Sequence, residues 1–179
     1  MSEIVAIPKS VGCDFVGGVY KAYATESSNI TAVTVTTGAI SAFTMADTGQ
    51  WGKLEFDDQD NVAFFNEAGE QSGNVTRING TGLMRFVGVT QSKITAANKA
   101  KACCGLVVIW FHYDGTKRVQ GIDVAPDGAW EFSNKLPRVI PNANSGTGGE
   151  ESLMEYNVAH QSRNLSPTTT LTDTEIEAL

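Results

Sequence analysis

The feature that most constrains this chain is a strand-like segment near its middle with apolar residues on both faces. Leu106–Tyr113 reads Leu-Val-Val-Ile-Trp-Phe-His-Tyr, and its first six residues are the longest apolar run in the sequence. Asp114-Gly115 follows, a dipeptide typical of type I′ hairpin turns, in which two successive residues need positive φ. Thr116–Val124 then returns as the partner strand. Because a strand with two apolar faces must bury both, we expect Leu106–Tyr113 to lie inside a sheet or to pack one face against another subunit.

Other segments rich in β-branched or alternating residues predict further strands separated by turns. Gly38, the acidic run Asp57–Asn61 and Asp127-Gly128 have the composition of turns. Arg138–Gly149 carries proline, asparagine and glycine and is predicted as a loop, whereas Ser166–Leu171 is predicted to be extended. The remaining predicted strands are Ile30–Thr37, Ile40–Met45, Trp51–Phe56, Val62–Phe65, Val75–Ile78, Thr81–Thr90 and Ser152–Gln161.

One segment has the pattern of a helix. Ser92 can cap it, Lys93–Cys104 can form it, and Gly105 can supply the left-handed position that often ends a helix. Spacing of i, i+4, i+7 and i+8 places four small residues on one face, which is expected to pack closely on a sheet. These residues are Ala96, Ala100, Cys103 and Cys104.

The tally of elements predicts a mainly β fold: two packed antiparallel sheets in a sandwich- or barrel-like arrangement, with one flanking helix near 92–104. We expect a β-sandwich domain over 16–161, an N-terminal arm over 1–15 and a C-terminal arm over 162–179, because both ends carry few large apolar residues. Within the second arm, Thr172 and Glu175 have the spacing of a capping box that opens a very short helix.

Composition excludes several classes of protein. Hydrophobic residues make up 41% and charged residues 18%, which is too apolar for a disordered chain. A membrane-spanning helix needs roughly 20 apolar residues, so no membrane anchor is expected, and the start of the chain lacks the pattern of a signal peptide. The net charge of −7 argues against a surface that grips a phosphate backbone.

The sequence offers no catalytic constellation, and we expect no catalytic residue, no cofactor and no bound metal. His112 and His160 have no cysteine or carboxylate at ligand spacing, and Asp57, Asp58 and Asp60 lack the pattern of a calcium loop. The cysteines (Cys13, Cys103 and Cys104) are interpreted as small apolar packing residues. The tryptophans (Trp51, Trp110 and Trp130) are expected in a core or an interface, with a carbohydrate-binding face as the alternative.

The order of helix, buried strand, Asp-Gly hairpin and a strand carrying Gly121 resembles the centre of the tail tube proteins, or major tail proteins, of tailed bacteriophages. The residues that carry the resemblance are Ala96–Gly121, and Ser145–Val158 resembles the loop and final strand that follow. The resemblance implies two packed β-sheets with a flanking helix. It also implies hexameric rings of identical subunits, stacked into a hollow tube through which DNA passes during ejection.

The same resemblance implies partners and a candidate contact site. The subunit would bind copies of itself and other tail proteins in the virion tail, after synthesis in the cytoplasm of a host bacterium, and DNA would pass without specific binding. Deleting residues 66–74, or the last 14 residues, is expected to block stacking and to leave a folded subunit. The candidate loop between rings consists of Asn66, Glu67, Ala68, Gly69, Glu70, Gln71, Ser72, Gly73 and Asn74.

Two physical arguments agree with a ring of identical subunits. An open sheet edge is prone to uncontrolled pairing, and a ring removes it by pairing strands between subunits. Acidic groups that faced a bore would repel DNA phosphates and keep the DNA from sticking. The alternatives are another virion structural protein, for capsid decoration or head–tail joining, and a β-sandwich module that binds carbohydrate or another surface ligand.

Overall fold

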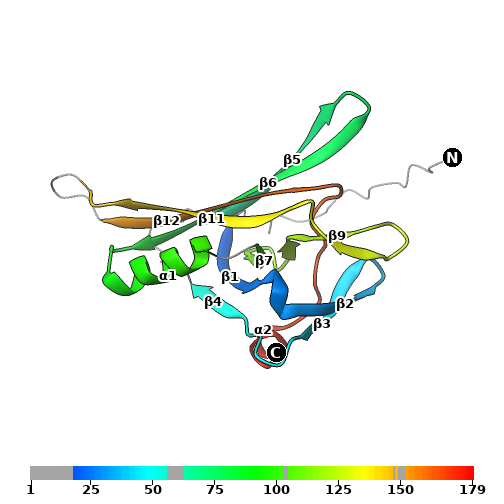
Figure 1. Cartoon of the computed structure of the whole chain (residues 1–179), viewed down its shortest axis with the longest axis horizontal. Coiled ribbons are helices and arrows are strands. Elements are labelled where there is room, and N and C mark those ends of the chain that lie inside the picture. The colour runs from blue at the N-terminus through cyan, green and yellow to red at the C-terminus, as the bar shows by residue number, and fades with distance from the viewer. Residues whose placement is uncertain (1–17, 56–62, 103–104, 147, 149–151) are drawn as a thin grey trace.

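The computed structural model describes residues 18–55, 63–102, 105–146, 148 and 152–179 of the chain. Over these residues the protein is mainly β, with several antiparallel sheets that are not closed into a barrel and a flanking helix (Figure 1). The predicted fold class is therefore confirmed, as a sandwich rather than a barrel. The predicted arm 1–15 and the predicted turn Asp57–Asn61 lie outside the described residues.

The middle layer is a four-stranded antiparallel sheet in the order β4-β1-β7-β8. Its strand β7 lies between two others, and six of its seven residues are buried, as expected for a segment with two apolar faces. The strands are β1 (Val19–Glu26), β4 (Gly52–Glu55), β7 (Leu106–His112) and β8 (Lys117–Gln120).

A second four-stranded antiparallel sheet, in the order β11-β12-β6-β5, covers one face of the middle layer. Its strands are long, and the hairpins β5–β6 and β11–β12 extend beyond the packed region in different directions (Figure 1). The strands are β5 (Phe64–Ser72), β6 (Val75–Val87), β11 (Lys135–Asn144) and β12 (Leu153–Ser162).

Two short antiparallel pairs complete the β structure, β2 with β3 and β9 with β10. A short 3₁₀ turn, η1 (Ser27–Asn29), leads into the first pair. The four strands are β2 (Ile30–Thr36), β3 (Ala39–Met45), β9 (Ile122–Val124) and β10 (Trp130–Phe132).

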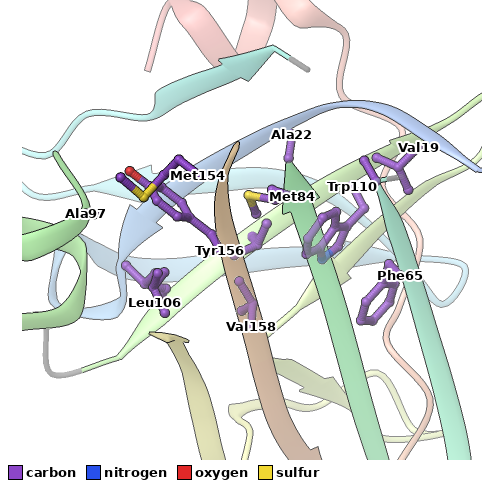
Figure 2. Close-up of a cluster of buried hydrophobic side chains, with 13 residues drawn as sticks. Val19, Ala22, Phe65, Met84, Ala97, Leu106, Trp110, Met154, Tyr156 and Val158 are labelled. Carbon is purple, nitrogen blue, oxygen red and sulfur yellow. The ribbon is translucent and has the colours of Figure 1, made fainter. Parts of the chain in front are cut away.

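Alternation along β7 divides the hydrophobic interior into two cores. Leu106, Val108 and Trp110 face the second sheet, where they pack with Phe65, Met84, Tyr156 and Val158 (Figure 2). The intervening residues face the opposite side, where they pack against β2–β3 and the C-terminal segment. These intervening residues are Val107, Ile109 and Phe111, each at most 1% exposed.

The flanking helix α1 (Gln91–Ala102) begins one residue before the expected cap. Ser92 lies inside the helix, and the hydroxyl of Thr90 instead accepts a hydrogen bond from the Lys93 amide at 3.4 Å. Of the predicted packing face, Ala100 does pack against the core, but Ala96 is exposed and its neighbour Ala97 is buried instead. Cys103 and Cys104 lie outside the described residues.

Both predicted Asp-Gly turns are present, but the first is not a type I′ turn. Gly115 has φ +83°, while Asp114 does not have a positive φ. The Gly115 amide donates to the His112 carbonyl at 3.0 Å, and the Asp114 carboxylate accepts from the Thr116 amide at 2.8 Å. The hairpin therefore has a three-residue loop with glycine in the left-handed position.

The predicted loop Arg138–Gly149 is largely a strand, because Arg138–Asn144 belongs to β11 and pairs residue by residue with β12. β11 lies at the edge of its sheet. An edge strand tolerates proline, which cannot donate a backbone hydrogen bond. Pro137 and Pro141 are therefore compatible with a strand, although the local composition is typical of a loop.

The segment 162–179 is not an arm apart from the core, because it packs against the domain. Leu171 is 7% exposed, and Ile176, in the short helix α2 (Asp173–Glu177), is fully buried in the second core. The predicted capping box at Thr172 and Glu175 is confirmed. The extended part of this segment lies between β8 and β3: the Val119 amide donates to the Pro167 carbonyl at 2.8 Å and the Ile40 amide to the Thr168 carbonyl at 2.8 Å.

Close packing of the two sheets makes one glycine indispensable. A Cβ on Gly82 would lie 2.3 Å from the Trp110 ring, whereas a Cβ on Gly69, in the neighbouring strand, would make an ordinary 3.7 Å contact with Ile78. We expect Gly82→Ala to lower the free energy of unfolding by about 1–3 kcal/mol or more, through overpacking. Gly69→Ala, the matched control, should change it by less than about 0.5 kcal/mol. Urea unfolding measures both, and equal stability of the two variants would contradict this account of the core.

Candidate assembly surface

The candidate contact site is a strand hairpin rather than the predicted loop. Asn66–Ser72 belongs to β5 and pairs with β6 in continuous register, and only Gly73 and Asn74 form the turn. Glycine, glutamate and asparagine are poor strand formers, so local composition favoured a loop. Cross-strand pairing overrides that preference here.

The outer half of this hairpin is exposed on both faces. Residues 68–71 and 73–77 are all exposed, and Val75 near the turn is 54% exposed. Within the described residues, β5 lies at the edge of its sheet, and Asn66–Ser72 makes backbone ladder bonds to β6 alone. An isolated two-stranded ribbon is marginally stable in water. This part of the hairpin therefore offers unpaired backbone groups and two open faces to a partner.

Glu67, at the base of the hairpin, is not available at the surface. Its side chain is 1% exposed and forms an ion pair with Arg118 of β8. The same carboxylate accepts hydrogen bonds from the Ser166 hydroxyl at 2.7 Å and the Ser166 amide at 3.0 Å. One side chain thus connects the hairpin, the middle sheet and the C-terminal segment.

A buried polar chain continues from Glu67 into the core. His160 Nε2 lies 3.5 Å from Glu67 Oε1, and His160 Nδ1 lies 2.8 Å from Gln120 Nε2. The side-chain oxygen of Gln120, Oε1, accepts from Trp110 Nε1 at 2.9 Å. The side-chain nitrogen of Gln120, Nε2, therefore faces His160 and donates to Nδ1. A neutral His160 then carries its proton on Nε2, toward the carboxylate.

Aromatic rings enclose this chain. The Phe65 ring stacks on Trp110 with 5.4 Å between centroids and an interplanar angle of 3°, and the Arg118 guanidinium lies 5.1 Å from the Phe65 centroid. Gly80 lies directly against His160, since a Cβ there would be 1.9 Å from the imidazole. The network is therefore closely packed, with the Glu67 carboxylate and the His160 imidazole buried.

The electrostatics of the network keep Glu67 ionised. Burial, the largest influence, raises the pKa of the Glu67 carboxyl, but the neighbouring His160 and Ser166 and the charge of Arg118 together outweigh it. The pKa therefore lies below its usual range. The Ser166 hydroxyl donates to the carboxylate rather than to an imidazole, so this is not the arrangement of an activated nucleophile. The geometry is that of a structural connection.

The other candidate residues are dispersed. Trp110 is fully buried, while Trp51 and Trp130 are half-buried against Phe43 and Phe132 respectively. Burial, the largest influence, lowers the pKa of His112. Over the described ranges, no group of three or more His, Cys, Asp or Glu side chains could hold a metal ion. Cys13, Asp57, Asp58 and Asp60 lie outside the described residues.

Sequence reasoning missed the network around Glu67, although one signal was present. Phe65 and Glu67 are two residues apart in a strand and therefore share a face. Because Phe65 faces the core, a carboxylate at position 67 must be buried with it and needs a partner. That partner, Arg118, lies 51 residues away in the sequence, so no local pattern identifies it.

Comparisons with known proteins give no relative. No family model matches the chain, no curated protein matches it, and no solved structure matches its fold. Among the helices that the structure describes, none is both long enough and apolar enough to cross a bilayer.

Proposed function

We propose that this protein is a structural subunit that assembles with copies of itself into stacked rings, as the tail tube of a bacteriophage. The observation that carries the proposal is the β5–β6 hairpin, which extends from the packed sheets with both faces exposed and its outer edge unpaired within the described residues. A neighbouring copy would pair with that edge and cover the faces. The same proposal includes hexameric rings, a conduit for DNA and association with other tail proteins. These parts come from the resemblance of Ala96–Gly121 to tail tube proteins.

Two other sheet edges in the described part of the subunit, those of β8 and β11, are less suited to pairing with another copy. The outer edge of β8 is already bonded to residues 167–169 of the same chain. β11 contains two prolines, each of which removes a backbone donor. β5 has nine residues and no proline. The proposal therefore assigns the principal contact between copies to β5 and its hairpin.

Shortening the hairpin tests this assignment while leaving Glu67 in place. Ala68 and Asn79 pair across the ladder in the same hydrogen-bonding phase as the residues that flank the native turn, so residues 69–78 can be replaced by Asn-Gly, a two-residue turn. We expect a folded subunit, by circular dichroism and urea unfolding, that no longer forms rings or tubes in negative-stain images. The cause is the loss of the exposed strand that a neighbour would pair with.

The matched control keeps the hairpin at full length and installs the same turn, by combining Gly73→Asn with Asn74→Gly. This control should assemble like the wild type. Tubes formed by the shortened, folded variant would overturn the assignment of the contact to the hairpin. A closed trimer, or a hexamer that never stacks, would instead indicate a capsid-decorating or head–tail joining protein.

A further inference from the structure

A polar hollow lies at the base of the β5–β6 hairpin, between β6, β12 and the start of β11. Its volume is about 770 Å³. Asn79 and Gln161 form part of its wall and are bonded to each other at 2.9 Å. Lys135 and Arg138, both exposed, contribute the cationic groups. The hollow is therefore open to a partner that approaches the hairpin.

The charge of this hollow is opposite to that of the protein as a whole. No carboxylate lines it among the described residues, and neither Lys135 nor Arg138 has an ion-pair partner there, although the chain carries a net charge of −7. The nearby Glu70 carboxylate is bonded to Asn79 at 2.7 Å. In the wall, Ser133 is 5% exposed, and its hydroxyl has no hydrogen-bond partner in the described part of the chain. Such a site favours a ligand with carboxylate groups.

The opposite edge of the same molecule carries carboxylates. Figure 1 shows α2 at the edge away from the β5–β6 hairpin. There, a hollow of about 400 Å³ is lined by Asp47 and Glu177, and no cation lines it among the described residues. Glu177 accepts from the Tyr23 hydroxyl at 2.7 Å and lies 3.6 Å from Lys53 Nζ, whereas Asp47 is exposed and makes no ion pair within the described ranges. We call this surface, Asp47 with Glu177, the acidic end. The other carboxylates of α2 are already engaged, because Asp173 pairs with Lys21 and Glu175 accepts from Thr172.

We propose that copies of this protein contact one another head to tail, with the acidic end of one copy seated at the Lys135–Arg138 hollow of the next. The inference rests on the proposed self-assembly and names the charged contact that directs it. Two different surfaces on opposite edges of a subunit form a heterologous contact, which repeats from copy to copy. Charge complementarity fixes the partner and the direction of stacking. The neighbour that reaches the hollow would also meet the hairpin above it.

Charge reversal at the hollow tests this contact. The double variant Lys135→Glu with Arg138→Glu places carboxylates opposite the carboxylates of the acidic end. We therefore expect the protein concentration needed for assembly to rise at least tenfold. Sedimentation velocity and negative-stain microscopy measure this concentration. Lys101→Glu, an exposed position on α1, is the control with the same type of charge change and should assemble normally. Adding Asp47→Lys to the double variant restores opposite charges and should restore assembly.

The outcomes separate this inference from the proposed function. If the wild type assembles and the folded double variant assembles equally well, the head-to-tail contact is wrong and self-assembly stands, whatever else the hollow binds. Failure of Asp47→Lys to restore assembly would also overturn the pairing of these two surfaces. If the wild type does not assemble under any condition, both the proposed function and this contact are wrong.

Discussion

Removing residues 166–179 is expected to unfold the subunit. The deletion takes Leu171 and Ile176 out of the second core, and truncating a buried aliphatic side chain to alanine alone costs about 2–5 kcal/mol. It also exposes the edges of β8 and β3 and removes the Ser166 bonds to Glu67. Because folded domains have only about 5–15 kcal/mol of stability, we expect no cooperative unfolding transition in urea.

A shorter deletion is the control for this result. Ala178 and Leu179 are exposed, so their removal should leave the unfolding transition nearly unchanged. The graded variant Ile176→Ala should retain a transition, shifted to lower urea concentration. A cooperative, wild-type-like transition after loss of 166–179 would show that this segment is a dispensable arm, as its sequence composition had indicated.

Replacing Glu67 by alanine is the point substitution with the largest expected effect. Arg118 and Ser166 would lose their buried acceptor, and breaking a buried ion pair by removing one partner costs about 3–5 kcal/mol. We expect the loss in the free energy of unfolding to fall in that range. Glu67→Gln keeps an acceptor for Ser166 and should lose less. Glu70→Ala, an exposed position three residues along the same strand, is the control.

The effect of Glu67 should depend on pH in a definite direction. Its folded-state pKa is lower than the ordinary value of 4.5, so its stabilisation is fully present above that value and is lost as the pH falls through the folded-state pKa. The stability difference between the wild type and Glu67→Gln should therefore be constant near neutral pH and should shrink as the pH falls below 4.5. A difference that grows on acidification would contradict the ionised, paired state of Glu67.

Several of the elements that sequence alone predicted have a buried face. β7, β2 and β3 alternate or run apolar because neighbouring layers cover them, and the left-handed positions at Gly115 and Gly128 follow from turn chemistry. The capping box of α2 is likewise predicted by a local pattern and is present in the structure.

Two of the elements that were missed lack that burial signal, whereas β1 was missed although it is a mostly buried strand of the middle sheet. The outer part of β5 is exposed on both faces, so no alternation marks it, and β11 is an edge strand whose proline and asparagine residues are typical of a loop. The segment 166–171 packs through backbone bonds to strands far away in the sequence, which no local pattern encodes. The candidate contact site, 66–74, stays a prediction, and its strand conformation and the burial of Glu67 became visible only in three dimensions.

The most direct test of the account is the assembly state of the purified full-length chain at high concentration. Negative-stain microscopy combined with light scattering measures it. Self-assembly through the β5–β6 hairpin predicts rings or tubes of many copies, with a scattering mass that rises with concentration. A monodisperse 19.1 kDa monomer at every concentration would contradict it.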